Sequence, residues 1–419
     1  MNKKLILSVL AGSVLLSGIT TNVYADLSVT APSGIQEQMQ GGRGMQRGGG
    51  MMQPGEGMMQ PGGEMMQPGG GMGGAQNVSS EPLPIVESTA VNTAAALEAD
   101  MANARRITVS ETENEVKIEE PGTYIISGSA SEGSITVKKG TTGVVLVLED
   151  LDLTCSTGAA LSLNKETEVK VIISGTVTLT DAEDPNNEYS SDAAVADAYD
   201  GAALKAKADS MVYITGDGTL NIIGKAKNGI KGGDNASLII SDPTLQIAAV
   251  NDGINVNNDL TILSGSIALN CGDDALHADK ILTIGSADGT GPVIYIAQAG
   301  EGAEAAIVNI FGGDITVNAS DDAINATNND DTYQGSINMT GGNVTINGMG
   351  DGFDSNGNIN LIGGSASINV QNRGGEAGVD YDGDYYISDA FQMNNAGGVS
   401  GPDNMGGGMG RGRGGWGMP

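Results

Sequence analysis

A five-residue pattern that recurs through most of the chain constrains the fold more than any other feature of the sequence. Each copy reads polar, small, apolar, polar, small. The seven central copies begin at Ala202, Asn228, Asp252, Asp274, Glu301, Asp322 and Asp351, at intervals of 26, 24, 22, 27, 21 and 29 residues. An early copy begins at Ala159 and a late one at Ala377. A repeat of this length indicates one small structural unit stacked many times.

The segments between these pentads predict short β-strands. Residues 308–317 and 337–346 each read as a strand, a Gly-Gly turn and a second strand. Three short strands in 21–29 residues correspond to one coil of a parallel β-helix. Leucine-rich repeats share this length but need a Leu-x-x-Leu-x-Leu frame, which is absent, and nonapeptide calcium repeats have a different period. We therefore predict an all-β, right-handed parallel β-helix over residues 92–395.

One short helix is expected just before the first coil. Residues 92–105 are rich in alanine, Asn92 is suited to cap a helix, and Leu97 and Met101 are four residues apart on one helical face. The end of a solenoid exposes unpaired strand edges, which natural proteins cover. We expect this helix to cover the open N-terminal end of the β-helix.

The N-terminus reads as an export signal. Lys3 and Lys4 precede the largely apolar residues 5–19, and Val23-Tyr24-Ala25 offers the apolar and small groups that a signal peptidase reads. We predict a signal peptide over residues 1–25, a mature start at Asp26, and an extracellular or cell-surface location. No later run approaches the length of a membrane span, so no membrane insertion is expected after cleavage.

Two low-complexity segments flank the predicted solenoid. Met-Met-Gln-Pro-Gly occurs three times, beginning at Met51, Met58 and Met65. Such Gly- and Pro-rich sequence buries too little apolar surface to fold, so we interpret residues 26–91 as a disordered spacer and residues 396–419 as a disordered tail. An alternative for the spacer is capture of a soft metal ion such as copper(I) by paired thioethers.

The charge of the chain narrows its possible binding partners. The chain has 51 acidic and 20 Lys and Arg residues, a net charge of −31, which argues against nucleic acid as a partner. An anionic ligand would need a divalent cation between itself and such a surface.

Cys155 and Cys271 fall about four coils, or roughly 19 Å, apart, well beyond the reach of a disulfide. We expect both to be unpaired.

The pentads place acidic residues in two columns. The first position reads Ala202, Asn228, Asp252, Asp274, Glu301, Asp322 and Asp351, and the fourth reads Lys205, Lys231, Asn255, His277, Glu304, Asn325 and Asp354. Equivalent residues of neighbouring coils lie about 5 Å apart, so these carboxylates repel one another unless a cation neutralises them. Calcium prefers such oxygen ligands. The predicted calcium ligands are Asp252, Asp273, Asp274, Glu301, Asp321, Asp322, Asp351 and Asp354.

Each of these residues also has a structural interpretation. Asp and Asn occur in solenoid turns because their side chains bond nearby backbone groups. We interpret His277, the only histidine, as a stacked polar residue rather than a metal ligand. Lys205 and Lys231 are expected to offset the negative charge at the N-terminal end of the columns.

The order of several short motifs resembles one known family. The motifs are Gly-Thr-Tyr-Ile-Ile-Ser-Gly at 122–128, Leu-Val-Leu-Glu-Asp-Leu-Asp-Leu at 146–153, and the segments at 228–232, 251–254 and 273–276. They resemble the secreted clostridial-type carbohydrate-binding β-helix proteins, which bind cellulose and polygalacturonate and are related in fold to pectate lyases. The resemblance implies calcium at the acidic coil edge and a preference for acidic sugars. Glu301-Gly-Ala-Glu departs from the usual Asp-Gly-Ile.

Three functions are therefore open. The first is a non-catalytic protein that binds acidic polysaccharide, such as polygalacturonate and with cellulose as a further candidate, through calcium. The second is a calcium-dependent polysaccharide lyase, in which a Lys or Arg removes the proton beside a sugar carboxylate; its candidates are Lys205, Lys231, Lys280 and Arg373. The third is a structural cell-surface adhesin. We favour the first, because no base is evidently placed beside Asp274 and Asp322.

Overall fold

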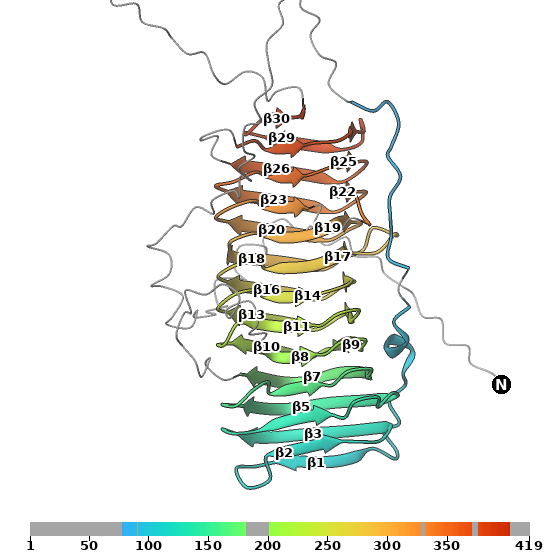
Figure 1. The fold of residues 1–419 in the computed structure, drawn as a ribbon, viewed down its shortest axis with the longest axis vertical. Coiled ribbons are helices and arrows are strands. Elements are labelled where there is room, and N and C mark those ends of the chain that lie inside the picture. The colour runs from blue at the N-terminus through green and yellow to red at the C-terminus, as the bar shows by residue number, and fades with distance from the viewer. Residues whose placement is uncertain (1–77, 90, 182–200, 328–331, 371–375, 403–419) are drawn as a thin grey trace, which may run out of the picture.

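The chain forms one long parallel β-helix. The computed structural model describes residues 78–89, 91–181, 201–327, 332–370 and 376–402, and about ten coils stack along its axis (Figure 1). Every pairing between named strands is parallel. The predicted all-β parallel solenoid is confirmed. The predicted signal peptide, most of the spacer, Arg373 and residues 403–419 lie outside the described residues.

Each coil contributes to three parallel sheets. The sheet that carries the pentads, the pentad sheet, contains β2 (Glu115–Ile118), β4 (Ser134–Val137), β6 (Leu161–Leu163), β8 (Ala202–Ala206), β11 (Asn228–Gly232), β14 (Ile254–Val256), the first parts of β17 (Leu276–Ile284) and β19 (Ala303–Ile310), β21 (Ile324–Ala326), β24 (Phe353–Ser355), β27 (Val379–Tyr381) and β30 (Val399–Ser400).

The second sheet, which we call the strap sheet, contains β1 (Arg105–Val109), the first parts of β3 (Gly122–Ala130), β5 (Val144–Thr154) and β7 (Glu168–Thr180), β9 (Met211–Gly216), β12 (Ser237–Ile240), β15 (Leu260–Ile262), the ends of β17 and β19, β22 (Ser336–Met339), β25 (Asn358–Leu361) and β28 (Tyr385–Ile387). The third sheet contains the ends of β3, β5 and β7, then β10 (Thr219–Gly224), β13 (Thr244–Ala249), β16 (Ser266–Cys271), β18 (Val293–Ala299), β20 (Asp314–Ala319), β23 (Asn343–Gly348), β26 (Ser365–Val370) and β29 (Gln392–Asn395).

The inner side chains stack in apolar columns along the solenoid axis. In the third sheet, burial alternates along strands such as β23, in which Val344 and Ile346 are buried while Thr345 and Asn347 are exposed. The register pairs Val344 with Ile315 on one side and with Ala366 on the other. Apolar side chains from all three sheets merge into one continuous core. This stacking explains how a chain with only 3% aromatic residues buries enough surface to fold.

Glycine is required where the strap sheet turns into the third sheet. Gly313, Gly342 and Gly364 precede β20, β23 and β26 and have φ values of 102°, 83° and 95°. L-residues rarely adopt this conformation. A Cβ atom at Gly364 would also lie 2.5 Å from the carbonyl oxygen of Gly342 on the previous coil. The Gly-Gly signals in the sequence therefore mark the corners at which successive coils stack most closely.

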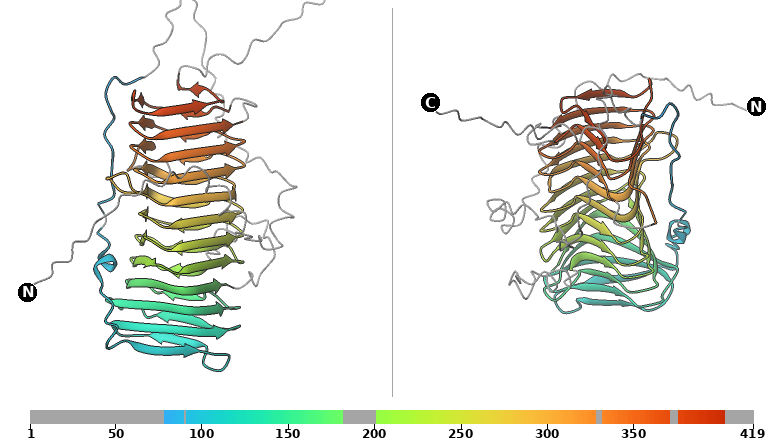
Figure 2. Two further views of the ribbon diagram at one scale, coloured as in Figure 1. Left: turned by 180° about the vertical axis from the view of Figure 1, so that it is seen from behind. Right: turned by 45° about the horizontal axis from the view of Figure 1, so that its top comes forward.

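Residues 78–104 run lengthwise along the strap sheet, and we call this segment the strap, leaving residue 90 aside (Figures 1 and 2). At one end Ser79 N donates to Tyr385 O of β28, and at the other Asp100 N donates to Thr123 Oγ1 of β3. Ten strand-to-strand steps separate β28 from β3, which corresponds to about 48 Å. The contact with the solenoid therefore begins well before residue 92, where we placed the start of the domain.

The helix expected over residues 92–105 is present only as the 3-10 turn η1 (Thr93–Ala96). Asn92 caps it as expected, with Oδ1 accepting from Ala94 N, but its Nδ2 also donates to Val212 O at 2.9 Å. Beyond the turn, Leu97 and Ala99 pack on the outward side chains of the strap sheet, which requires the two-residue period of an extended chain. This contact outweighs the weak intrinsic preference of a short helix.

The position of this segment also corrects its expected role. It does not cover the open end of the solenoid, because η1 contacts β7 and β9 on the side of the molecule. Both cysteines are unpaired and buried, as predicted. No helix among the described residues is long and apolar enough to cross a membrane.

Asn360 is the residue whose replacement should loosen the strap most clearly. It is fully buried in β25, its Oδ1 accepts from Leu83 N at 3.2 Å, and its Nδ2 donates to Leu83 O at 3.0 Å. Asn360→Ala should lower the free energy of unfolding by about 2–3 kcal/mol, because it removes the hydrogen-bond partner of two part-buried backbone groups of Leu83. Chemical denaturation checks this, with Asn369→Ala at an exposed position as the control. Equal stability of the two variants would contradict a structural role for the strap.

Candidate functional site

The pentads lie in register, as the sequence analysis required. The third pentad residue of each coil faces the core, and Ile254 pairs with Leu276, which in turn pairs with Ala303. The first residues are joined through the backbone, since Gly253 N donates to Asp274 O at 2.8 Å and Ala275 N donates to Glu301 O at 2.9 Å. The acidic side chains therefore follow one edge of the pentad sheet.

The small second residue of each pentad allows neighbouring coils to stack closely. A Cβ atom at Gly253 would lie 2.6 Å from Ala275 O, and one at Gly352 would lie 2.4 Å from Gly378 O. The backbone of the next coil therefore approaches too closely for any large side chain. The sequence preference for Gly or Ala after the acid has a packing cause, and it holds consecutive acids about one strand spacing apart.

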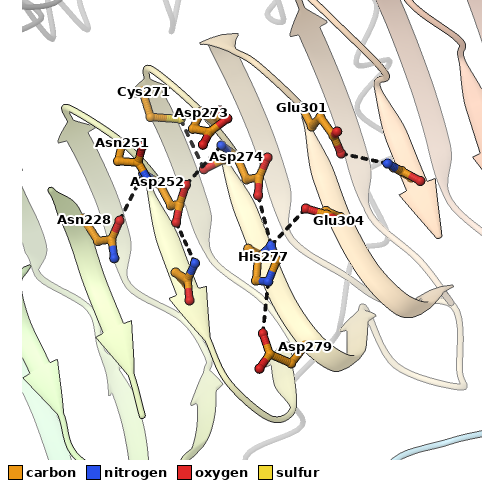
Figure 3. Close-up of polar contacts among 12 residues, drawn as sticks. Asn228, Asn251, Asp252, Cys271, Asp273, Asp274, His277, Asp279, Glu301 and Glu304 are labelled. Carbon is orange, nitrogen blue, oxygen red and sulfur yellow. Dashed lines mark hydrogen bonds and ion pairs between the residues drawn. The ribbon is translucent and has the colours of Figure 1, made fainter. Parts of the chain in front are cut away.

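Amide side chains satisfy the first acid of the column. Asp252 is buried, with 3% of its surface exposed. Its Oδ1 accepts from Asn251 Nδ2 at 3.0 Å and its Oδ2 accepts from Asn255 Nδ2 at 2.6 Å (Figure 3). Lys231 on the preceding coil donates to Asn255 Oδ1. This part of the column is neutralised by the protein itself.

His277 forms the centre of a first acidic cluster. Its Nδ1 lies 2.9 Å from Asp274 Oδ2 and 3.1 Å from Glu304 Oε2, and its Nε2 lies 3.1 Å from Asp279 Oδ1 (Figure 3). Burial disfavours the charged imidazole, but hydrogen bonds to the three carboxylates outweigh it and raise the pKa of His277 to about 12. His277 is therefore an internal cation of this coil, which agrees with the interpretation of a polar residue stacked in the column.

A second cluster, Asp322, Asp351 and Asp354, contains carboxylates alone. Ligand oxygens from all three lie within 4.8 Å of one another. Asp322 Oδ1 accepts from Asp351 N at 2.6 Å, and Asp351 Oδ1 accepts from Ala377 N. No His, Lys or Arg side chain among the described residues pairs with this cluster. We call it the carboxylate cluster.

The carboxylate cluster holds its protons unusually tightly in the absence of a cation. Burial, followed by the repulsion of Asp322, raises the pKa of Asp354 to about 8. Burial also raises the pKa of Asp351 to about 7, with hydrogen bonding to Ala377 opposing and the charges of Asp322 and Glu376 adding to the increase. The pKa of Asp322 is likewise raised, first by burial. Three carboxylates that cannot all ionise together favour a bound cation.

Asn325 contributes a buried acceptor oxygen to the same part of the pentad sheet. Its side chain is 7% exposed and lies in register between Glu304 and Asp354. Its Nδ2 donates to Glu301 Oε2 at 3.0 Å, whereas its buried Oδ1 has no hydrogen-bond partner. The carboxylates beside it are acceptors when ionised, and they can satisfy this acceptor oxygen only while they are protonated. A buried carbonyl oxygen without a donor is costly, and a metal ion is one group that would satisfy it.

The eight predicted calcium ligands do not converge on a single site. It brings Asp322, Asp351 and Asp354 together, and it places Asp274 against His277. Asp252, Asp273, Glu301 and Asp321 lie outside both clusters. Burial, followed by the charge of Glu304, raises the pKa of Glu301 to about 8. Sequence reasoning did not single out Glu304 or Asn325 as site residues, although both occupy the fourth pentad position, which forms the second of the two columns.

The donor sets of the two clusters favour different cations. Oxygen ligands alone, as in the carboxylate cluster, suit calcium or magnesium, whereas a set that includes imidazole suits a transition metal. In the first cluster the imidazolium already supplies the positive charge. The residues therefore fit an oxygen-coordinated divalent ion best at Asp322, Asp351 and Asp354, and Asn325 lies in register with Asp354 on the neighbouring strand.

Comparison with known proteins identifies the family. A family model described as carbohydrate-binding domain-containing protein matches residues 112–305 and 289–404. These matches cover more than half of the chain, and the chain belongs to this family. A search of curated proteins finds no match. A solved structure described as the polysaccharide lyase-like protein from C. thermocellum, gadolinium derivative, is 22% identical over 71% of this chain and 98% of that chain, with a TM-score of 0.35.

The raised pKa values predict how stability depends on pH when no metal is bound. A carboxyl group with a folded-state pKa above its unfolded value stabilises the protein at low pH and loses that contribution as pH rises through the folded pKa. For Asp354 the window runs from its ordinary value of 3.8 to about 8. In chelator, Asp354→Asn should therefore become more stable relative to the wild type between pH 5 and pH 8.5. Thermal melts of both proteins across this range check the sign; a constant difference would contradict it.

Proposed function

We propose that this protein is an exported, non-catalytic carbohydrate-binding protein that recognises acidic polysaccharide through calcium. Membership of the carbohydrate-binding family supports the class of ligand. The observation that carries the finer proposal is the carboxylate cluster, in which Asp322, Asp351 and Asp354 converge without a partner cation from the described part of the chain. The apolar segment that follows Lys3 and Lys4 supports export to the extracellular medium or the cell surface.

Calcium is the cation that suits this cluster best. It takes six to eight oxygen ligands in flexible geometry, whereas magnesium requires near-octahedral geometry and gives up water reluctantly. Asp322, Asp351, Asp354 and Asn325 Oδ1 would supply part of that shell. The remaining positions are left for water or for an oxygen of the ligand.

A sugar carboxylate would complete the shell and explain how an acidic protein holds an acidic polymer. The net charge of −31 repels a polyanion at short range. An ion held between the carboxylate cluster and a uronate group converts this repulsion into attraction. Polygalacturonate is the proposed ligand, because each of its residues offers one such carboxylate.

The surroundings of two of the four candidate bases, Lys231 and Lys205, support binding rather than catalysis. Lys231 is 8% exposed and donates from Nζ to both Asn255 Oδ1 and Asn257 Oδ1. It lies on the coil of β11, whereas the carboxylate cluster lies on the coils of β21 and β24. A general base must reach the proton that it removes. Lys205 precedes Lys231 by one further coil.

Calcium titration tests the metal part of the proposal. Asp354→Asn should weaken calcium binding by about tenfold or more, because it removes one charged ligand from a small set. Isothermal titration calorimetry measures this, with Asp217→Asn at an exposed position outside the cluster as the matched control. Identical affinities for the two variants would place calcium elsewhere.

Retention on immobilised polygalacturonate tests the ligand. The wild-type protein should be retained with calcium and released by chelator, and Asp354→Asn should elute early even with calcium present. Release of an unsaturated product that absorbs near-ultraviolet light would instead establish the lyase alternative. A structural adhesin without sugar specificity would show no retention in either buffer.

A further inference from the structure

One lysine and one asparagine are direct neighbours in the column formed by the fourth pentad residues. Register pairs Lys231 of β11 with Asn255 of β14, so the two side chains leave the pentad sheet one strand spacing apart. Lys231 is buried, and its Nζ donates to Asn255 Oδ1 at 2.5 Å. The preceding lysine of this column, Lys205, is flanked instead by Ser162 and Lys231. The contact between an amine and an amide is therefore specific to the coils of β11 and β14.

This contact brings the amine of Lys231 close to the amide carbon of Asn255. A C=O bond is about 1.23 Å long, so a donor 2.5 Å from Oδ1 at an ordinary hydrogen-bond angle lies about 3.3 Å from Cγ. Reacting atoms about 3–3.5 Å apart have the separation of a near-attack arrangement. The lysine nitrogen is therefore in position to attack the asparagine carbon.

Asp252 holds the nitrogen end of the same amide. Its Oδ2 accepts from Asn255 Nδ2 at 2.6 Å, and the carboxylate is buried. Its Oδ1 is held by Asn251 Nδ2 at 3.0 Å and by Asp274 N at 3.3 Å. A carboxyl group in this position can pass a proton to the amide nitrogen as that nitrogen leaves. The site thus combines a nucleophile, an amide carbon and a proton carrier.

We propose that Lys231 and Asn255 form an intramolecular amide bond that links the coils of β11 and β14. The neutral Nζ attacks Cγ, so that an Nζ–Cγ bond forms and the Cγ–Nδ2 bond breaks. Asp252 takes a proton from Nζ and passes it to Nδ2, which leaves as ammonia. Atoms and electrons balance in this exchange of one amide for another, and no oxidant or reductant is consumed. The reaction is independent of calcium and of any sugar.

Burial favours the reaction and also selects the partner. Lysine is a nucleophile only as the neutral amine, and burial disfavours charge on amine and carboxyl groups alike. Lys231 Nζ also donates to Asn257 Oδ1, and Asn257 Nδ2 donates to Asp234 Oδ1 at 3.2 Å. Asp234 is exposed, so water competes for its carboxylate, whereas Asp252 is buried. Asn255 is therefore the assigned partner.

The bond would reinforce the solenoid at the coil where the acidic column begins. Lys280 is the only Lys or Arg that follows Lys231 in the part of the chain that the structure describes, whereas Asp252 and Asp274 open the run of acids. Cys155 and Cys271 form no disulfide. A covalent link between coils restricts the unfolded chain and so stabilises the fold, as a disulfide does.

Mass spectrometry of the purified protein under denaturing conditions tests the proposal. The wild-type protein should be lighter than its sequence mass by one molecule of ammonia, whereas Lys231→Arg should have its full mass. Asn255→Ala should also have its full mass, and the matched control Asn257→Ala should keep the loss of ammonia. A full mass for the wild-type protein would overturn the proposal, and this measurement does not depend on whether any variant folds.

Tryptic peptides locate the bond. Trypsin cleaves after a free lysine, so the linked protein should give one peptide of residues 228–280 that lacks one ammonia, in place of the separate peptides 228–231 and 232–280. Asp252→Asn removes the proton carrier at nearly constant shape and should give the separate peptides, with circular dichroism to check its fold. Loss of ammonia that persists in Lys231→Arg, or that disappears in Asn257→Ala but not in Asn255→Ala, would contradict the assigned bond. A linked peptide from Asp252→Asn would contradict the role of Asp252.

Discussion

Parallel stacking of coils at the spacing of β-strands is the constraint on which the rest of this structure depends. Once every residue has an equivalent about 4.8 Å above and below it, any residue type that the repeat favours becomes a column. Apolar residues form a continuous core, glycines form the tight corners, and acids form a line of charge. The same geometry that builds the core with few aromatic side chains also creates the electrostatic repulsion that the site must resolve.

The chain resolves that repulsion differently along its length. Near Asp252 the acid is paired with amides, and one coil further on the imidazolium of His277 holds Asp274 and Glu304 together. Beyond these coils, among the described residues, no side-chain cation enters the column, and the carboxylates of Asp322 and Asp354 have raised pKa values, burial being the largest cause. Internal cations at one end and an external cation at the other would neutralise a single acidic edge.

The three faces of the solenoid have correspondingly different chemistry. The pentad sheet carries charge, the strap sheet is bound by the chain's own N-terminal segment, and the third sheet turns polar side chains such as Thr345 and Asn347 toward solvent. A long rod with separate faces suits polymeric ligands, because contacts repeat along the direction in which a polymer extends. Membership of the carbohydrate-binding family agrees with a polymeric ligand of this kind.

The sequence by itself determined the repeat, the parallel β-helix and the register of the pentads, because a period that places apolar residues inside admits few other stackings. It also separated Cys155 from Cys271 correctly. Only the tertiary structure decided which acids converge, because Asp322, Asp351 and Asp354 come from two coils and their side-chain directions depend on the corner between them. The strap was likewise beyond local reasoning: Leu97 and Ala99 pack on strands distant in sequence, and that contact replaces the helix their composition favoured.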